Sequence, residues 1–194
     1  MKNVPRPFGG ARRALLLTAL LASLVAVPRP GGGPQDAGVG LLEQLRYPKT
    51  VVLVRHAEKG ADDPRDPGLS AAGEQRAREL ARLLGRAGVT HLYASEFRRT
   101  RATLEPLSLV CGAAIQTVSA RDPEALVSAL AELPRGSLAV VAGHSNTVPA
   151  LVHLLAPKHE AFVLSEGDHD RLYAVTLTGD RGPATVLELR FGAE

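Results

Sequence analysis

The stretch TVVLVRHAEK, residues 50–59, decides the fold because it joins an uninterrupted apolar run to a pair of basic residues. A short, continuous run rich in β-branched residues is typical of a strand buried within a parallel sheet. Arg55 and His56 follow this run, so they leave the strand at its carboxyl end. Open α/β sheets place their ligands at that edge. The stretch therefore predicts a buried strand with a functional site at its end.

A second apolar run repeats this arrangement downstream. Residues 138–142, LAVVA, are followed directly by Gly143 and His144. A histidine can act as a nucleophile, and an arginine binds phosphate oxygens well. Two histidines at strand ends, with an arginine beside one of them, therefore indicate phosphate chemistry.

Apolar strands alternate with helical patterns along the rest of the chain. We expect helices after the cap Ser70, from Arg99 to about residue 110, from Pro123 to Leu133 and from Ser145 to Leu155. Strands are also expected at residues 91–94 and 114–118, and residues 172–177 and 185–189 are expected to pair as a hairpin. The alternation predicts a three-layer α/β/α sandwich with a mostly parallel sheet.

Three short motifs follow one another along the chain. They are Arg55-His56-Ala57-Glu58, the segment Ser95-x-x-x-Arg99-x-x-x-Thr103, and Gly143-His144. In order and separation they resemble the motifs of the histidine phosphatase superfamily, which includes the phosphoglycerate-mutase-like enzymes. The resemblance covers about residues 50–177 and implies a phosphoglycerate-mutase-like fold.

The resemblance also implies a role for the motif residues. The histidine that becomes phosphorylated in the family corresponds to His56, and the catalytic arginine corresponds to Arg99 rather than Arg98. Phosphoryl transfer depends mostly on positioning the group and on stabilising negative charge. Arg55, Arg99 and His144 are expected to supply positive charge, and the N-terminus of the following helix adds backbone N–H groups. Two neighbouring guanidinium groups are also expected to keep His56 neutral and nucleophilic.

Four further residues are candidates for substrate binding: Ser95, Asn146, Glu58 and Thr103. For three of them a structural role is the alternative. Ser95 and Thr103 are of the type that caps or packs helices, and Asn146 stands where a helix cap is expected.

Asp122 is the candidate general acid, although the family's mutase-like members carry a Glu on the corresponding segment. Pro123 at the first helical position would leave Asp122 as the N-cap near a strand end. Capping alone would explain an Asp there. In that case the candidates are Glu124, Glu58 or a carboxylate of residues 166–170.

His169 lies among Glu166, Asp168 and Asp170, a composition that a metal site could use. Such clusters in loops are more often solvated turns, and we expect a solvated turn here. No metal and no other cofactor is expected, because the proposed nucleophile and charge-stabilising groups are all protein side chains.

The amino-terminal residues differ in composition from the remainder. Residues 1–28 join a basic head to the apolar stretch of residues 14–27, which predicts a signal peptide or an N-terminal anchor. Residues 29–40 read as a flexible Pro- and Gly-rich linker, and residues 41–194 as the folded domain. The protein is therefore expected to be exported to the periplasm or the exterior, and to meet a membrane only through an uncleaved N-terminal segment.

The net charge of +3 arises in this leader. Five of the 23 Lys and Arg residues and none of the 20 acidic residues lie within the first 30 positions, which leaves 18 basic against 20 acidic residues. No nucleic-acid partner is expected from such a balance. Cys111 is the only cysteine, so an intrachain disulfide is excluded.

The residues and the resemblance together predict a metal-independent phosphomonoesterase with a phosphohistidine intermediate on His56. Its expected partner is a small phosphorylated substrate or a phosphoprotein. A phosphoglycerate-type mutase and a protein-phosphohistidine phosphatase are the alternatives within the family. A phosphate-binding module without turnover is the non-enzyme alternative.

Overall fold

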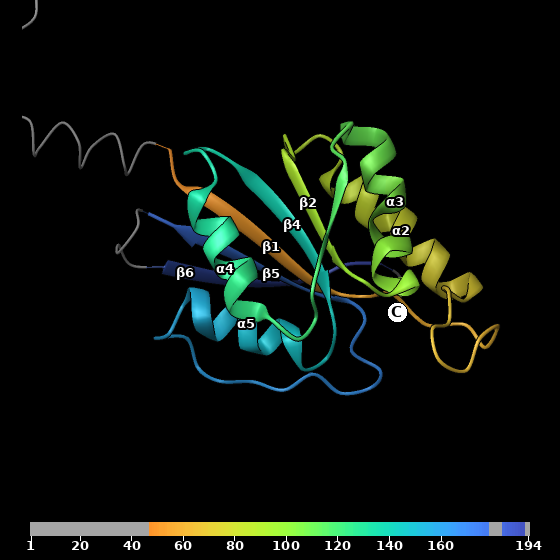
Figure 1. Cartoon of the computed structure of the whole chain (residues 1–194). Helices are drawn as coiled ribbons and strands as arrows, with labels where there is room; N and C mark the ends of the chain where they lie inside the picture. The colour runs from red at the N-terminus through yellow and green to blue at the C-terminus, as the bar shows by residue number, and fades with distance from the viewer. Residues whose placement is uncertain (1–46, 179–183, 193–194) are drawn as a thin grey trace, which may run out of the picture. The chain divides into compact units, whose positions relative to one another are not determined.

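The computed structural model describes residues 47–178 and 184–192. Within these ranges one six-stranded sheet has the order β3-β2-β4-β1-β5-β6 (Figure 1). Its strands are β1 Lys49–Arg55, β2 His91–Ser95, β3 Ile115–Val118, β4 Leu138–Gly143, β5 Arg171–Leu177 and β6 Ala184–Arg190. β1 lies at the centre and pairs in parallel with β4 and antiparallel with β5. The sheet is therefore mostly parallel, with an antiparallel β5–β6 edge.

Helices cover both faces of this sheet. They are α2 Ala71–Leu84, α3 Arg98–Cys111, α4 Pro123–Glu132 and α5 Thr147–Leu155. Val52 and Val54 share a buried cluster with residues of α2 and α3, whereas Val51 and Leu53 share one with residues of α4 and α5. Successive strand residues point to opposite faces, so β1 is buried on both sides. The predicted three-layer α/β/α sandwich is confirmed.

α2 shows how the local sequence sets an element that borders the site. The Ser70 hydroxyl accepts a hydrogen bond from Gly73 N at 3.1 Å and caps the helix, as its position predicts. The buried face consists of Gly73, Ala77, Leu80, Ala81 and Leu84. A Cβ atom at residue 73 would lie 2.2 Å from the carbonyl oxygen of Glu58. The first turn of α2 therefore lies directly against the backbone that follows His56.

Several element boundaries differ from the expected ones. The helix expected from Ser145 begins at Thr147, with Asn146 as its N-cap. The helix expected to reach Leu133 ends at Glu132. β5 and β6 pair in register from Arg171 opposite Arg190 to Leu177 opposite Ala184, so the expected hairpin is present, although its connection at residues 179–183 lies outside the described residues.

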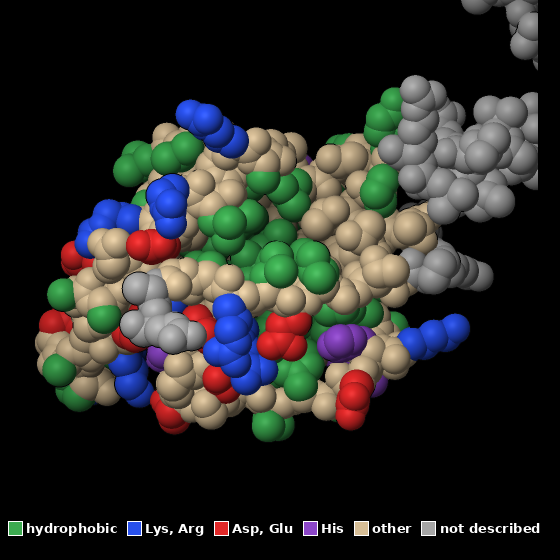
Figure 2. Space-filling view, turned by 180° about the vertical axis from the view of Figure 1, so that it is seen from behind, with side chains coloured by type: hydrophobic (Ala, Val, Ile, Leu, Met, Phe, Trp, Pro, Cys, Tyr) green, Lys and Arg blue, Asp and Glu red, His purple; other side chains and the backbone are tan. Residues whose placement is uncertain are grey.

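The surface leaves some apolar groups uncovered. Leu187 and Leu189 of β6 are 57% and 45% exposed. Figure 2 shows apolar side chains gathered near the centre of the face seen from behind. Cys111, at the end of α3, is half-buried and packs against the cluster under α2 and α3.

The predicted leader, residues 1–28, and linker, residues 29–40, lie outside the described residues. In the part of the chain that the structure describes, no helix combines the length and apolar character needed to cross a membrane.

Candidate active site

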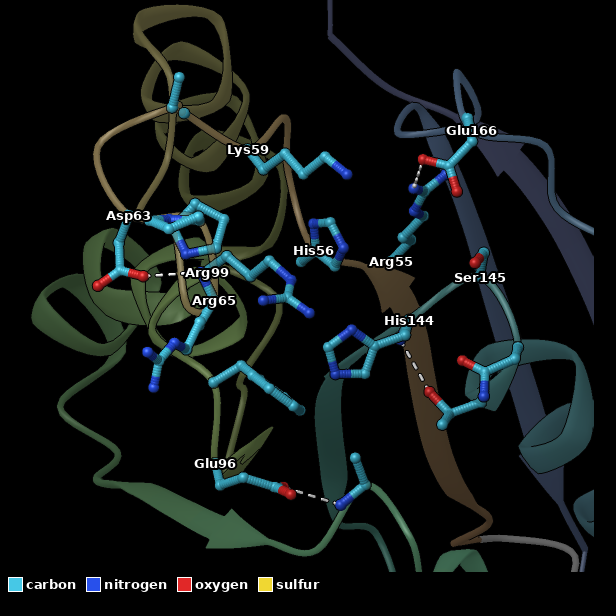
Figure 3. Close-up of a pocket in the computed structure, with 18 of the residues that line it drawn as sticks. Arg55, His56, Lys59, Asp63, Arg65, Glu96, Arg99, His144, Ser145 and Glu166 are labelled. Carbon is cyan, nitrogen blue, oxygen red and sulfur yellow. Dashed lines mark hydrogen bonds and ion pairs between the residues drawn. The ribbon is translucent and has the colours of Figure 1, made fainter.

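A cleft of about 770 Å³ opens at the carboxyl ends of the central parallel strands. Its walls come from the ends of β1 and β4, from the residues just before α3 and α5, and from the loop at residues 60–68, here called the 60–68 loop. Charged and histidine side chains dominate the lining (Figure 3): Arg55, His56, Lys59, Asp63, Arg65, Glu96, Arg99, Arg121, His144 and Glu166.

The parallel pairing of β1 and β4 brings the two predicted histidines together. Arg55 lies in register with Gly143, and His56 N donates a 2.9 Å hydrogen bond to Gly143 O. The His56 and His144 rings consequently lie with centroids 5.3 Å apart, at an interplanar angle of 64°. The strand ends therefore place both imidazoles at the floor of one cleft.

The imidazole of His56 is neutral and has one free ring nitrogen. Its Nδ1 lies 2.8 Å from the carbonyl oxygen of Ala57. A carbonyl only accepts, so Nδ1 carries the proton and Nε2 keeps its lone pair. Burial and, to a smaller extent, the charges of Arg99 and Arg55 lower the pKa of His56 to about 3, against the raising effect of the Ala57 carbonyl. Nε2 of His56 thus offers a lone pair that needs no deprotonation at neutral pH.

His144 has a different ring partner. Its Nε2 lies 2.9 Å from the hydroxyl of Ser95, which lies 2.8 Å from the hydroxyl of Thr100. The backbone N–H of His144 donates to the Thr147 hydroxyl at 2.8 Å. Burial lowers the pKa of His144 to about 4; the Arg99 charge adds to this effect and Glu96 opposes it. The end of β2 therefore holds the ring of His144, the first residue of α5 holds its backbone, and the ring is neutral at neutral pH.

Arg99 reaches the cleft from the first turn of α3. Its guanidinium lies over the ring of Phe97, 4.5 Å from the ring centroid, and its Nη1 lies 3.6 Å from Asp66 Oδ1. The Phe97 ring also stands at 88° to the His144 ring, with centroids 5.1 Å apart. Phe97 therefore positions an arginine and a histidine at once. The motif pattern does not distinguish this residue, and sequence reasoning missed it.

Arg55 is buried on the side of the cleft that lies across His56 from Arg99. Its Nη1 donates to the carbonyl oxygen of Ser165, and its Nη2 lies 3.4 Å from a carboxylate oxygen of Glu166. In Figure 3 the Arg55 and Arg99 side chains lie on either side of His56. The free nitrogen of His56 thus belongs to a site with two guanidinium groups.

Comparisons with known proteins agree with this geometry. The sequence profile of the histidine phosphatase superfamily (branch 1) matches residues 51–121, which include two of the three motifs. The third motif, Gly143-His144, lies at the end of the strand beside β1. Residues 51–121 of the chain are thus similar to the histidine phosphatase superfamily.

Curated relatives match a shorter segment. The probable phosphoglycerate mutase GpmB of Shigella dysenteriae is 38% identical over 68 residues, which is 32% of this chain and 32% of that protein. An Escherichia coli protein of the same name matches over the same length and with the same identity. The match thus spans about a third of the length of these relatives.

Solved structures of the superfamily share the fold over most of their length. The protein histidine phosphatase SixA complexed with tungstate has a TM-score of 0.60 at 21% identity, covering 73% of this chain and 96% of that one. A mycobacterial glucosyl-3-phosphoglycerate phosphatase has a TM-score of 0.58 at 15% identity, covering 72% and 97%. At such identities the likeness shows a common fold.

Two of the predicted substrate-binding residues, Ser95 and Thr103, instead make hydrogen bonds that hold the site together. Ser95 contacts His144 as described above. The Thr103 hydroxyl accepts a 2.9 Å hydrogen bond from Ala57 N and donates one of 2.8 Å to Arg99 O. Neither side chain lines the cleft. Thr103 therefore ties the segment that follows the nucleophile to the helix that carries Arg99.

Asn146 and Glu58, the other two candidates, lie in different surroundings. Asn146 lines the cleft, and its side chain makes no capping hydrogen bond to α5. Glu58 points away from the cleft, and its Oε1 lies 2.7 Å from Arg76 Nη2 of α2. Burial would raise the pKa of Glu58, but its hydrogen bonds, above all that from Arg76, outweigh burial and lower it. The geometry thus favours Asn146 and not Glu58 as a substrate contact.

Asp122 lies at the N-cap of α4, the position that the alternative capping role predicts for it. Its Oδ1 accepts a 2.9 Å hydrogen bond from Ala125 N at the start of α4. Ala120 and Arg121 line the cleft, but Asp122 does not. The cap directs the carboxylate toward the amides of its own helix, so the structure gives Asp122 a structural position rather than that of a general acid.

The expectation of a solvated turn around His169 is wrong. The His169 side chain is buried, and its Nδ1 lies 2.8 Å from the carbonyl oxygen of His56. Asp168 and Asp170 pair with Arg171 and Arg190. Among the described residues no group of three potential ligands could hold a metal ion. His169 therefore supports the backbone of His56.

The 60–68 loop is fastened to the start of α3, mainly through Arg98. Arg98 Nη1 donates to Asp62 Oδ2 at 3.1 Å, and Arg98 N donates to Asp66 Oδ1 at 3.1 Å. Lys59, just before the loop, and Arg65 within it both line the cleft. Sequence reasoning missed these two cations because no motif marks a loop side chain.

Proposed function

We propose that this protein is an exported, metal-independent phosphomonoesterase that transfers the phosphoryl group to His56 and then to water. One observation carries the proposal: the Nδ1 proton of His56 is held by a backbone carbonyl, which leaves Nε2 as a free lone pair between two arginines. A nucleophile of this kind needs no base and no metal.

The reaction has two steps. First, Nε2 of His56 forms a bond to phosphorus, the ester P–O bond breaks, and its electron pair leaves with the alcohol oxygen. Then a water oxygen attacks phosphorus and the P–Nε2 bond breaks, which returns the electron pair to the imidazole. Arg55 and Arg99 stabilise the charge on the non-bridging oxygens, and the N-terminus of α5 adds backbone N–H groups.

The substrate is a small phosphorylated molecule or a phosphorylated side chain of a protein. The cleft supports this range because it is open and its lining carries five basic residues against three acidic ones. Lys59, Arg65 and Arg121 add positive charge beyond the two arginines at the nucleophile, which favours anionic ligands.

A protein-phosphohistidine phosphatase is the second candidate, supported by the fold likeness to SixA. For that substrate the leaving atom is an imidazole nitrogen. Assays with 4-nitrophenyl phosphate and with a phosphohistidine-bearing protein would rank the two candidates by kcat/KM. A phosphoglycerate-type mutase, as the curated relatives are named, would instead interconvert phosphoglycerate isomers without net release of phosphate.

The central test is covalent trapping. Protein quenched during turnover of a labelled phosphomonoester should carry an alkali-stable, acid-labile phosphoryl group at His56, and EDTA should leave turnover intact. Binding of phosphate without turnover or label would point to a binding module. Activity lost with EDTA and restored by a divalent ion would contradict a metal-independent reaction.

Export rests on the composition of residues 1–28. Fractionation of cells that make the full chain should place the protein outside the cytoplasm, and deletion of residues 1–28 should retain it inside. An intact chain found only in the cytosol would contradict export.

A further inference from the structure

The proposed function leaves the proton for the departing oxygen without a source. An alkoxide is a poor leaving group, so hydrolysis of an alkyl phosphate gains from a positioned acid. Among the described residues, the cleft is lined by three carboxylates: Asp63, Glu96 and Glu166. The contacts of these three side chains show which of them can act as a proton donor.

Asp63 and Glu96 are engaged in backbone hydrogen bonds. Asp63 Oδ1 accepts from Arg65 N at 2.7 Å and from Asp66 N at 3.0 Å, and these bonds lower the pKa of Asp63. Glu96 Oε2 accepts from Ala120 N at 2.9 Å, which lowers its pKa in the same way. Both carboxylates are therefore stabilised as anions, which makes them poor proton donors.

Nearby carboxylates that do not line the cleft either make hydrogen bonds or ion pairs with other residues or lie away from the cleft. Glu58 pairs with Arg76, and Asp122 caps α4. Asp168 Oδ2 accepts from Ser165 N at 2.7 Å. Glu124, in the first turn of α4, does not line the cleft.

Glu166 lies on a turn, residues 165–169, that is fastened to both members of the Arg55-His56 pair. The Ser165 carbonyl accepts from Arg55, and His169 bonds the carbonyl of His56. The Glu166 side chain is 82% exposed, and one of its oxygens lies 3.4 Å from Arg55 Nη2. Within the described ranges no backbone N–H donates to it. In Figure 3 its carboxylate lies at the rim of the cleft beside Arg55.

We propose that Glu166 is the general acid of this site, an inference that rests on the proposed function. Arg55 pairs with Glu166 before a ligand enters. A bound phosphate dianion competes for the same guanidinium and places a second negative group beside the carboxylate. Two negative groups that compete for one guanidinium favour the proton-bound form of one of them. The ligand thereby converts Glu166 from an ion-pair partner into a proton donor.

The proton is conserved across the two steps. The Glu166 carboxyl gives its proton to the alcohol oxygen as the P–O bond breaks and the P–Nε2 bond forms. In the second step the Glu166 carboxylate takes a proton from the attacking water. Glu166 takes up one proton from solvent when the phosphate binds and holds that proton again at the end, while ester and water enter and alcohol and phosphate leave.

The test is the dependence of Glu166→Gln on the leaving group. The measured quantity is kcat/KM, which reports the step in which the P–O bond breaks. For an alkyl phosphate, kcat/KM should fall by roughly 10²–10³-fold, as expected on loss of a general acid. For 2,4-dinitrophenyl phosphate, whose leaving group departs without a proton, the loss should be within about threefold. Thermal unfolding should be unaffected, because Glu166 is largely exposed.

Two matched variants serve as controls. Glu160→Gln removes an exposed carboxylate on the same connection that does not line the cleft, and it should leave both substrates unaffected. Glu96→Gln removes a second cleft carboxylate, and any loss it causes should be equal for both substrates.

Other outcomes would overturn the assignment. An equal loss for both substrates in Glu166→Gln would show that Glu166 only positions Arg55, and an equal gain would show that it only screens that arginine. Activity toward the dinitrophenyl ester that survives His56→Ala would overturn the proposed function itself, and the inference with it.

Discussion

His56 and His144 leave neighbouring parallel strands at the same edge of the sheet, but their rings have different partners. A carbonyl oxygen bonds Nδ1 of His56, whereas a hydroxyl bonds Nε2 of His144. A carbonyl only accepts and fixes one tautomer, while a hydroxyl either donates or accepts and leaves both tautomers accessible. The strand ends place two similar groups side by side, and the ring partner leaves one with a fixed lone pair at Nε2 and makes the other an adaptable hydrogen-bonding group.

The sharpest test of this difference compares His56→Ala with His144→Gln. Loss of a nucleophile should lower kcat by about 10⁵-fold or more, whereas loss of a stabilising donor should cost roughly 10²–10³-fold. Steady-state kinetics with an aryl phosphate measure both. Trapped phosphoprotein should vanish in the first variant and remain detectable in the second. The reverse pattern would exchange the roles of the two histidines.

Arg99→Ala tests the positive charge that acts on both the His56 and the His144 rings. Arg99 lowers the pKa of His56 and of His144 and stands beside the free nitrogen of His56. Its loss should cost about 3–4 kcal/mol of transition-state stabilisation, or roughly 10²–10³-fold in kcat/KM. Arg101→Ala, which removes an exposed arginine of the same helix paired with Glu105, is the control. A loss of less than about tenfold would contradict direct charge stabilisation.

Both histidines should make folding sensitive to acid. Their pKa values are lowered to about 3 and about 4, below the value near 6.5 in the unfolded chain. As pH falls below 6.5 the unfolded state takes up protons that the folded state does not, so stability decreases. Between pH 7 and pH 5 the free energy of unfolding should fall by roughly 2 kcal/mol for each of the two.

Urea unfolding at both pH values measures this loss. His144→Gln should reduce the pH dependence, and His153→Gln, an exposed residue of α5, should leave it unchanged. An identical pH dependence in all three proteins would contradict a buried, neutral His144.

Ser95→Ala tests the hydroxyl partner of His144. The variant leaves Nε2 without its bond, which should lower kcat/KM by about tenfold, a typical cost of an unmade hydrogen bond. Ser108→Ala is the control. It removes a hydroxyl that donates to Ala113 O near the C-terminal end of α3, and it should affect stability alone. Ser95→Thr, if it folds, should recover part of the rate. An unaffected rate in Ser95→Ala would show that Phe97 alone orients His144.

Asp122→Asn should have the smallest effect, because Asn caps a helix about as well as Asp. We expect kcat/KM within about twofold of the parent for alkyl and aryl phosphates alike. Asp122→Ala should cost about 1 kcal/mol of stability through loss of the cap. A selective loss with alkyl phosphates in Asp122→Asn would return the acid role to Asp122.

The sequence predicts the parts of this site that follow from strand and helix periodicity. An apolar run ending in Arg55-His56 and another ending in His144 can meet only where parallel strands share an edge, and the structure confirms this meeting. The cap at Ser70 was equally predictable, because a local hydrogen bond determines it.

Contacts between distant segments were not predictable in this way. His169 bonds a carbonyl 113 residues away, and no periodicity relates the two positions. Glu58 sits within a motif, yet the docking of α2 gives it Arg76 as a partner. Phe97 contacts two site residues through its ring faces, which a one-dimensional pattern does not encode.

The way the 60–68 loop is fastened bears on how this site can change during evolution. The segment at His56 is held by backbone groups and by the Thr103 hydroxyl, which bonds Ala57 N, whereas the loop is tied to α3 largely through Arg98. Insertions in the loop would alter the wall of the cleft and leave the strand ends in place. Substrate preference can therefore diverge by loop replacement while the chemistry at His56 is inherited without change.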